Sequence, residues 1–480
     1  MKKINICFDL YCDETPLFIE SIKQLSDEYN MLGVTLGSRF KKEVNTLPVT
    51  IEICNINDYI TNDINNIDIS IDNLKNIERK YDIDSLSFII LSDRYLSEYN
   101  YNDSLKILVG YILFYENLFS KYKINYYIDT AVALMPQFIA FKLAKKFNII
   151  FLGIFNTPFS DARIVFLNDW QDKWDNVFNQ YENNNFDISE IDSAKKYVKS
   201  FNINNMKPSY MNGPMQSNTL KIIFLKEFIK RFKEYFIYKK FNDLYDYMSL
   251  NPLIYAKREI KKIIMKKYFL ISNKSIFDKV NDNDSFYLFP LHLQPEASTL
   301  MMAPYYNNQV TTIEYIAKSI PAGSYLYVKE HKSAFGKHSK MFYKNIRKLP
   351  NVKLISPFED TRRLILKSIC PIVLTSTVGW EAILLGKPTI ALGHVFYNRY
   401  GLTVPIDSYE HLSNTLQYKI ENYSVDKKTL YRFIASIFAA SHTSIFDVPH
   451  FQPKRVLSHE NILDFSNAIK NEIKMRSNDI

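Results

Sequence analysis

The segment LTSTVGWEAILLGKPTIALG, residues 374–393, combines residue types that suit the binding of an anion. An apolar run ends in Ser376 and Thr377, Gly379 follows, and a helical pattern begins at once. Hydroxyl groups, free backbone N–H groups and the positive end of a helix dipole would then meet at one point, which suits a phosphate or diphosphate. Glu381, one turn into the helix, could bind a ribose hydroxyl. An equally simple interpretation is a serine or threonine that only caps the helix.

Lys329 and His331 form a second group, in YVKEHK (327–332), where a predicted strand ends. Residues two apart on a strand lie on one face, so a cation and an imidazole would stand together. They could neutralise a nucleotide phosphate as it departs, without a metal ion. A lysine and a histidine at a strand end can also simply be solvated, and the pair taken alone favours that interpretation. Within the set of three motifs we favour the catalytic one.

The third group lies in FPLHLQPEAST, residues 289–299, where His292, Gln294, Glu296 and Ser298 alternate along a strand that leads into a loop. Their side chains are therefore expected to face the same cleft. A carboxylate there could bind sugar hydroxyls or act as a base on an acceptor hydroxyl. The alternative is an ordinary loop whose serine caps the apolar run that follows.

In their order and spacing, these three segments resemble the donor-binding region of bacterial capsule and surface-polysaccharide glycosyltransferases. The group includes the Kdo-transferase-like capsule biosynthesis proteins, which use CMP-activated sugars. TSTVGWEAILLGKPTIALG is similar to their donor-binding segment, YVKEHK to their Lys-Glu-His-Pro strand end, and FPLHLQPEAST to their glutamine-containing loop. The resemblance covers residues 285–400, and Lys332 replaces the family's proline after His331.

The residue types and the resemblance together predict a site without a metal or a cofactor, whose substrates are a nucleotide-sugar donor and a glycan or glycolipid acceptor. The expected catalytic residues are Glu296, His331 and His292. The expected donor-binding residues are Lys329, Ser376, Thr377, Gly379, Glu381 and Gln294. The resemblance favours CMP-Kdo or another CMP-sugar as the donor, with a UDP-sugar as the main alternative.

Strands and helices must build the N-terminal part of such a protein. There, short apolar runs alternate with longer amphipathic ones. The predicted strands are 4–11, 31–37, 88–93, 124–130 and 148–154, and the predicted helices are 16–29, 101–121 and 135–147. This alternation implies a parallel sheet with helices on both faces. Asp129 falls at the carboxyl end of a strand, where open α/β sheets bind ligands.

The alternation returns after residue 285. The predicted strands are 286–293, 324–331, 352–358, 371–377 and 387–393, and the helices are 312–320, 340–349, 361–368 and 378–386. We therefore predict an α/β protein with two Rossmann-like lobes and a helical, basic insertion, which is the GT-B architecture. The expected parts are an acceptor lobe, a mostly helical bridge, a nucleotide-sugar lobe and a helical tail, at residues 1–160, 161–280, 281–440 and 441–480.

The net charge of +9 is concentrated in one segment. Residues 220–267 contain 13 Lys or Arg and 5 Asp or Glu, so this segment alone carries +8. Such local basicity argues against a nucleic-acid partner. Isoleucine and phenylalanine among the lysines favour an amphipathic face on anionic lipid headgroups. A solvated helix that packs on the protein by its aromatic side is at least as good an interpretation.

The remaining sequence features restrict the class of protein. The longest apolar runs are too short to cross a membrane, and acidic residues interrupt the start of the chain before a leader could form. We expect a cytoplasmic protein, peripheral on the inner face of the membrane if the basic segment binds lipid. No phosphate-loop, dinucleotide, zinc-protease or serine-hydrolase motif occurs. A nucleotide-sugar epimerase of the related two-lobed fold and a non-catalytic assembly or export partner are the alternative functions.

Overall fold

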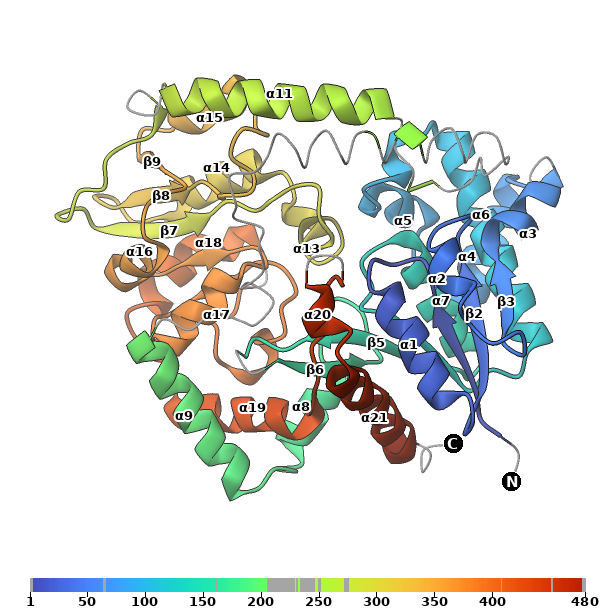
Figure 1. The fold of residues 1–480 in the computed structure, drawn as a ribbon. Helices are drawn as coiled ribbons and strands as arrows, with labels where there is room; N and C mark the ends of the chain where they lie inside the picture. Colours follow the sequence, from blue (N-terminus) through green and yellow to red (C-terminus); the bar gives the residue numbers. More distant parts are fainter. Residues whose placement is uncertain are drawn as a thin grey trace.

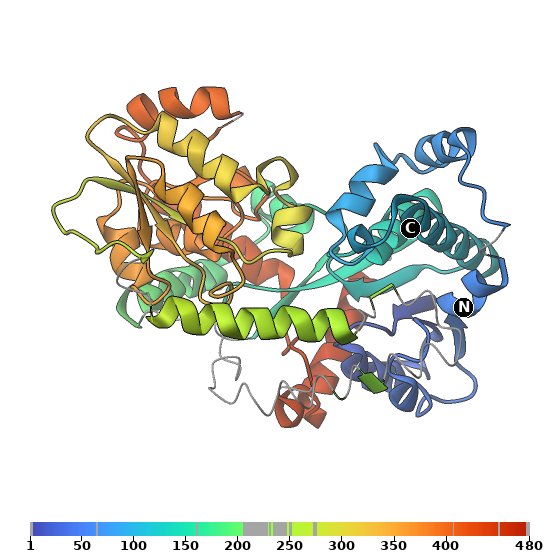
Figure 2. The same ribbon diagram turned by 90° about the horizontal axis from the view of Figure 1, so that it is seen from above.

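The computed structural model describes residues 3–63, 66–159, 162–204, 229, 232–233, 247–248, 252–271, 276–406, 408–449 and 452–476. These residues form two α/β lobes side by side, and helix α11 (Pro252–Ile271) runs across both of them (Figures 1 and 2). Of the basic segment 220–267, most of residues 220–251 lie outside the described residues. Within the described parts of the chain, no helix is both long and apolar enough to span a membrane.

The first lobe is built on a seven-stranded sheet in the order β12-β6-β5-β4-β1-β2-β3. Its strands are β1 (Asn5–Asp9), β2 (Asn30–Thr35), β3 (Glu52–Asn55), β4 (Tyr126–Thr130), β5 (Ile150–Asn156), β6 (Arg163–Leu167) and β12 (Ser441–Thr443). The first five strands are parallel, and β6 pairs antiparallel with both β5 and β12. The strand order reverses between β1 and β4, which makes this the topological switch point of the lobe.

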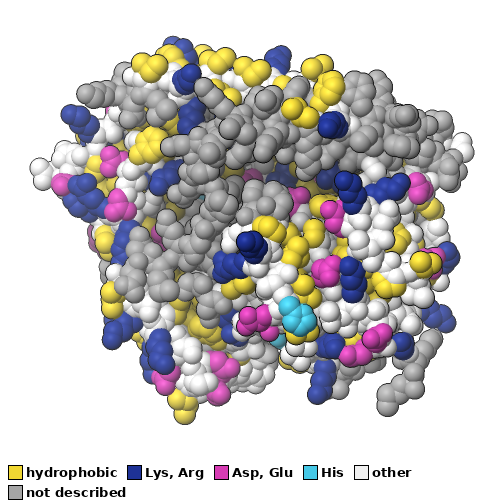
Figure 3. Space-filling model, viewed as in Figure 1, with side chains coloured by type: hydrophobic (Ala, Val, Ile, Leu, Met, Phe, Trp, Pro, Cys, Tyr) yellow, Lys and Arg dark blue, Asp and Glu magenta, His cyan; other side chains and the backbone are white. Residues whose placement is uncertain are grey.

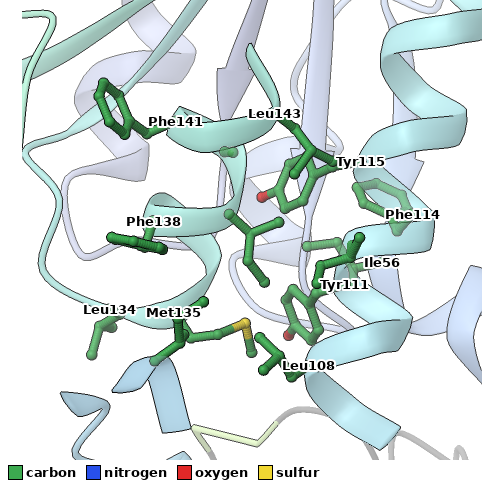
Figure 4. Close-up of a cluster of buried hydrophobic side chains, with 14 of the residues drawn as sticks. Ile56, Leu108, Tyr111, Phe114, Tyr115, Leu134, Met135, Phe138, Phe141 and Leu143 are labelled. Atoms are coloured by element: carbon green, nitrogen blue, oxygen red, sulfur yellow. The ribbon is translucent and has the colours of Figure 1, made fainter. Parts of the chain in front are cut away.

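Helices cover both faces of this sheet. They are α1 (Thr15–Leu25), α2 (Lys41–Val44), α3 (Ile56–Asp63), α4 (Ile71–Tyr81), α5 (Leu86–Ser92), α6 (Tyr101–Lys121) and α7 (Met135–Lys146). The predicted helices 101–121 and 135–147 are thus confirmed as α6 and α7. Figure 4 shows that Tyr111 of α6 lies beside Met135 of α7, in the buried cluster that also contains Tyr115 and Phe138. This apolar contact fixes both helices against the sheet.

The predicted strand 88–93 of the first lobe is wrong, because residues 88–92 belong to helix α5. The Ser85 hydroxyl accepts a hydrogen bond from the backbone N–H of Phe88, which starts the helix. Leu86, Ile89 and Ile90 are all buried, at the spacing of one helical face. A short apolar run fits a buried strand and a buried helix equally well, so periodicity could not decide between them.

The second lobe repeats the plan of the first. Its strands are β7 (Phe286–Pro290), β8 (Tyr325–Lys329), β9 (Val352–Ile355), β10 (Ile372–Val373) and β11 (Ile390–Ala391). A parallel bridge between Leu288 and Pro371 sets β10 beside β7. The strand order is therefore β9-β8-β7-β10-β11, which matches β3-β2-β1-β4-β5 in the first lobe. The predicted pair of Rossmann-like lobes is confirmed by this repeated order.

The helices of the second lobe surround these strands. They are α13 (Ala297–Leu300), α14 (Gln309–Ser319), α15 (Lys340–Arg347), α16 (Thr361–Lys367), α17 (Thr377–Leu384), α18 (Tyr409–Asn414) and α19 (Lys427–Ala440). Between the lobes in sequence, α8 (Asp175–Glu182) and α9 (Ile188–Asn204) pack against α19. Apolar residues of these helices join those of the second lobe in one buried cluster.

Two of the predicted boundaries need correction. Residues 163–167 form β6 in the first sheet, so the first lobe continues beyond residue 160. The C-terminal segment is also not a separate tail, because β12 joins the first sheet. Helices α20 (Pro453–Val456) and α21 (His459–Arg476) follow, and Phe465 of α21 stacks on Phe18 of α1 at 6.0 Å. The end of the chain therefore completes the first lobe (Figure 1).

Candidate functional site

The switch point of the second lobe brings two of the sequence motifs together. His292 follows β7 and Thr375 follows β10. The backbone N–H of Thr375 donates to His292 Nε2 at 3.1 Å, and its hydroxyl donates to the carbonyl oxygen of Ser298 at 2.9 Å. These two bonds tie the loop 289–299 to the start of α17. The carboxyl ends of adjacent parallel strands lie at one edge of a sheet, which is why motifs far apart in sequence meet here.

Hydrogen bonds hold both the backbone of His292 and its Nε2 atom. It is only 6% exposed, and Gln309 brackets its backbone, accepting from the N–H at 2.7 Å and donating to the carbonyl oxygen at 3.1 Å. Burial, with a smaller contribution from the nearby His331, lowers the pKa of His292 to about 3. The ring is therefore neutral at physiological pH. While Nε2 accepts the Thr375 N–H, that nitrogen is not free to take a proton from a substrate.

Helix α17 begins with the predicted hydroxyl residues. The Ser376 hydroxyl oxygen accepts from the backbone N–H of Val378 at 3.2 Å, so Ser376 does cap the helix. Its hydroxyl hydrogen remains available to donate to a ligand. Thr377 is the first residue of the helix, and both side chains are half-buried. Glu381 lies one turn further along and is also half-buried.

Gly379 has a structural explanation. A Cβ atom at this position would lie 2.3 Å from the Tyr397 hydroxyl oxygen. That hydroxyl donates to the carbonyl oxygen of Ser376 at 3.1 Å and so supports the start of α17 from below. Gly379 allows this close approach of Tyr397, and the donor contact expected for it stays a prediction.

The end of strand β8 carries the second motif. Lys329 is 6% exposed, and its ammonium donates to the carbonyl oxygen of Pro357 at 3.3 Å. Burial, together with the charge of Lys332, lowers the pKa of Lys329 to about 8. Its neighbour Glu330 is fully buried and accepts hydrogen bonds from the Tyr343 hydroxyl and from the backbone N–H of His331. Burial raises the pKa of Glu330 to about 7.

His331 follows directly and is open to solvent on one side. Its Nδ1 accepts from the backbone N–H of Ser333 at 3.2 Å, so the neutral ring carries its proton on Nε2. Protein on the other side displaces water and lowers the pKa of His331, and the charges of Lys329 and Lys337 act in the same direction. His331 in turn lowers the pKa of His292. The second motif therefore lies within electrostatic reach of the first.

The third motif departs from the predicted alternation. Strand β7 ends at Pro290, so the residues from His292 to Ser298 do not share one strand face. The side-chain amide of Gln294 is engaged at both ends, donating to the carbonyl oxygen of Asn307 at 2.6 Å and accepting from Gln309 at 2.8 Å. Gln294 thus supports the loop, and its contact with a donor stays a prediction.

Glu296 lies where the two lobes meet. It directly precedes α13, which contacts α5 of the first lobe (Figure 1). Burial raises the pKa of the Glu296 carboxyl, while the charges of Arg94 and Lys337 lower it. Arg94 belongs to the first lobe and Lys337 to the loop after His331. This carboxylate therefore faces cations from both lobes.

Sequence reasoning missed four members of this site: Glu330, Lys337, Thr375 and Arg94. Glu330 and Thr375 lie inside motifs whose other residues were chosen, so their position was the available signal. Arg94 had no such signal, because it meets the second lobe only through folding. Its Nε atom is buried and has no hydrogen-bond partner among the described residues. The described site gathers lysine, histidine, hydroxyl and carboxylate groups around the end of one sheet, which suits an anionic, polyhydroxylated ligand.

Several solved structures are similar to the chain at low sequence identity. KpsC, the beta Kdo 2,7 transferase of Thermosulfurimonas dismutans, is 12% identical with a TM-score of 0.39, over 74% of this chain and 89% of that one. UDP-GlcNAc 2-epimerase from Neisseria meningitidis is 14% identical with a TM-score of 0.27, over 90% and 94% of the two chains. Anabaena Alr3699/HepE in complex with UDP is 12% identical with a TM-score of 0.31, over 99% and 100%.

The sequence itself matches a known family over part of its length. The comparison with curated proteins found no match to this chain. Residues 203–430 match the family model described as capsule polysaccharide biosynthesis protein. This region is slightly less than half of the chain, and it contains every predicted site residue from His292 to Glu381. Over these residues the chain therefore resembles the capsule polysaccharide biosynthesis proteins, as its three motifs predict.

Proposed function

We propose that this protein is a GT-B glycosyltransferase that builds a bacterial capsular or other surface polysaccharide. It would transfer a sugar from CMP-Kdo or another CMP-sugar to a glycan or glycolipid acceptor. The observation that carries the proposal is the pair of hydrogen bonds from Thr375 to His292 and Ser298. These bonds place the hydroxyl residues of α17 beside the loop that holds Glu296, with Lys329 and His331 at the neighbouring strand end.

The donor phosphate would bind at the start of α17. The Ser376 hydroxyl can donate to a phosphate oxygen, and the helix dipole favours a negative charge at this end. Lys329 is mostly protonated at neutral pH, since its pKa of about 8 would rise further beside a phosphate. His331 would donate from Nε2 as negative charge grows on the leaving nucleotide. The positive charge of Lys329 and the O–H and N–H donors of Ser376 and His331 make a metal-independent reaction the simplest proposal.

Glu296 would act as the base toward the acceptor. Its raised pKa suits a group that must accept a proton near neutral pH. In the net reaction, the acceptor oxygen bonds to the anomeric carbon of the sugar and loses its proton to Glu296. The bond from that carbon to the phosphate oxygen breaks, and the nucleotide leaves. His292 would be a positioning residue, because its ring joins the two strand ends through Thr375.

The protein would act in the cytoplasm. All four cysteines are free thiols, which suits a reducing compartment. A nucleotide-sugar donor and a glycan or glycolipid acceptor would be its only partners in the reaction, and a nucleic acid has no part in it.

Ligand stabilisation tests the donor first. The melting temperature of the full chain is measured with CMP, UDP, GDP and dTDP, since a ligand that binds only the folded protein raises it. We expect CMP to give the largest rise. The purified protein is then incubated with the matching nucleotide sugars, with and without a glycan acceptor. Nucleotide release only with acceptor supports transfer, interconversion of the sugar without acceptor would indicate an epimerase, and neither binding nor turnover would indicate a non-catalytic assembly protein.

A further inference from the structure

Helix α11 is fixed to both lobes by its inner face. Arg258 forms an ion pair with Glu98 of the first lobe at 2.7 Å. Near the other end, the buried Phe269 meets the ring of Tyr343 in the second lobe edge-on, at 5.0 Å. A Cβ atom at Gly336 would lie 2.9 Å from the carbonyl oxygen of Lys262, so the helix backbone rests directly on that loop. Helix α11 is therefore an integral part of the fold, and its outer face is the side opposite these contacts.

The outer face of α11 exposes a line of isoleucines. Ile260, Ile264 and Ile271 are 51%, 59% and 87% exposed, and their spacing of four and seven residues places them on one side of the helix. Ile263 and Tyr268 extend this apolar surface, at 36% and 39% exposure. Figure 3 shows hydrophobic and basic side chains alternating along the rim where α11 lies. Contiguous apolar surface of this kind marks an interaction site.

Positive charge borders the same line. The helix contains six Lys or Arg and one Glu, which gives it a net charge of +5. Lys257, Lys261 and Lys267 are exposed and form no ion pair with the described residues. Lysine can extend its aliphatic stem along an apolar contact while its ammonium reaches an anionic headgroup. A helix with an apolar ridge between lysines has the pattern of one that lies in the plane of a membrane interface.

We propose that the outer face of α11 binds the surface of an anionic phospholipid bilayer. The isoleucines would enter the boundary between headgroups and acyl chains, and the lysines would contact phosphates. The sequence-based hypothesis for 220–267 thus becomes specific to one face of one helix. The inner face of this helix rests on Gly336, five residues after His331, so bilayer binding would hold the candidate site beside the lipid surface. This inference does not depend on which sugar, if any, the protein transfers.

Co-sedimentation of the full chain with vesicles tests it. Vesicles of phosphatidylcholine alone are compared with vesicles that contain phosphatidylglycerol. We expect binding to the anionic vesicles only, and release as salt rises, since exposed charges are screened. If the protein sediments equally with both kinds of vesicle, or with neither kind, the proposal is overturned.

A double substitution tests whether vesicle binding depends on the exposed isoleucines of α11 or on exposed apolar side chains in general. Ile260→Gln with Ile264→Gln should weaken vesicle binding by roughly tenfold or more, because two inserted side chains are lost. Both residues are exposed, so the fold should tolerate the change. The matched control is Ile71→Gln with Leu366→Gln, two aliphatic residues of similar total exposure on other helices. Unchanged binding by the first variant, or equal loss by the control, would contradict a contact through α11.

The lysines provide an independent test. Lys257→Gln, Lys261→Gln and Lys267→Gln should each reduce binding to anionic vesicles by about fivefold. The control makes the same charge change at three other exposed lysines: Lys419, Lys427 and Lys428. Light scattering of the protein without lipid completes the set. A dimer that the two isoleucine substitutions dissociate would assign the ridge to a second copy of the chain and overturn the membrane proposal.

Discussion

The two lobes share one strand order, yet their switch points are opposite in chemistry. In the first lobe, β1 ends in Asp9 and β4 carries Asp129. Both carboxyls are fully buried, and both Asp9 oxygens accept tyrosine hydroxyls, from Tyr11 and Tyr127 at 2.7 Å each. In the second lobe the same place holds a neutral histidine bonded to a backbone N–H, with a helix N-terminus and cations beside it. The first switch point is acidic and closed, and the second is basic and partly open.

A shared proton explains the first switch point. The Oδ2 atom of Asp129 is buried and has no donor among the described residues. Burial raises the pKa of Asp129, and the neighbouring Asp9 carboxyl raises it further. We infer that Asp129 is protonated and that its hydroxyl can donate to Asp9, which would give the buried Oδ2 atom a partner. Strand order thus determines where polar groups meet in such a lobe, and the side chains decide whether a ligand can enter.

The largest effect should come from Glu296, which tests whether the chemistry belongs to the second lobe. Glu296→Gln keeps the size of the side chain and removes its basicity. We expect transfer to fall by about 100-fold or more, with an unchanged dissociation constant for the nucleotide. Steady-state kinetics and calorimetry measure the two quantities. Near-normal turnover in Glu296→Gln, together with loss of turnover in Asp129→Asn, would move the base to the first lobe and reverse the comparison.

The next effect concerns donor binding at α17. Replacing both Ser376 and Thr377 with Ala should weaken nucleotide binding by about 1–3 kcal/mol, the usual scale for hydrogen bonds to a charged group. Loss of a helix cap alone could also lower stability, so a capping control is needed. Asp426→Ala removes the cap of α19, where Asp426 accepts from the Thr429 N–H at 2.9 Å. Calorimetry should show an unchanged nucleotide affinity for this control, and an unchanged affinity in the double variant would remove both hydroxyls from the site.

The buried, neutral His292 at the second switch point should make the folded protein less stable in acid. Its pKa is about 3 when folded and 6.5 as a free side chain, so the unfolded chain binds a proton that the folded one does not. Neutral His292 therefore makes its full contribution to the free energy of unfolding above pH 6.5. As the pH falls, this contribution is lost, by about 2 kcal/mol at pH 5. His292→Gln can still accept the Thr375 N–H but does not titrate. Urea unfolding at pH 5 and pH 7.5 should show a smaller difference for the variant, and an equal difference would place the titration elsewhere.

The sequence was sufficient for the parts of this site that follow from strand ends. Lys329, His331, His292 and Ser376 meet because parallel strands present their carboxyl ends at one edge, and the strand pattern of the second lobe is regular. The two-residue strands β10 and β11 lie within the predicted strands 371–377 and 387–393. The helix α5 was missed because its apolar run is too short for periodicity to decide.

Packing between distant segments could not be predicted. Arg94 reaches Glu296 only because α13 contacts α5, and nothing near Arg94 in sequence indicates this. The burial of Glu330 follows from Tyr343, thirteen residues away on the next helix. The close approach of Tyr397 to Gly379 was likewise not predictable, because Tyr397 lies eighteen residues further along the chain. In each case the deciding partner lies on another element, where spacing along the chain carries no information.

The smallest effect should come from Asp129. It concerns the pH dependence of the free energy of unfolding, and its sign is opposite to that expected for His292. The pKa of Asp129 is raised in the folded protein. Its contribution to the free energy of unfolding is therefore complete below the ordinary aspartate pKa and is lost as the pH rises. Asp129→Asn keeps a donor to Asp9 and cannot ionise. Relative to the unsubstituted chain, the variant should therefore gain stability between pH 5 and pH 8, measured as the shift in urea midpoint. Asp9→Asn is the contrast, because it removes one of two oxygens that accept tyrosine hydroxyls, and it should lose stability across this whole range. Parallel pH profiles for Asp129→Asn and the unsubstituted chain would mean that Asp129 is ionised and hydrated. The first switch point would then be an open crevice like the second, and the contrast between the lobes would fail.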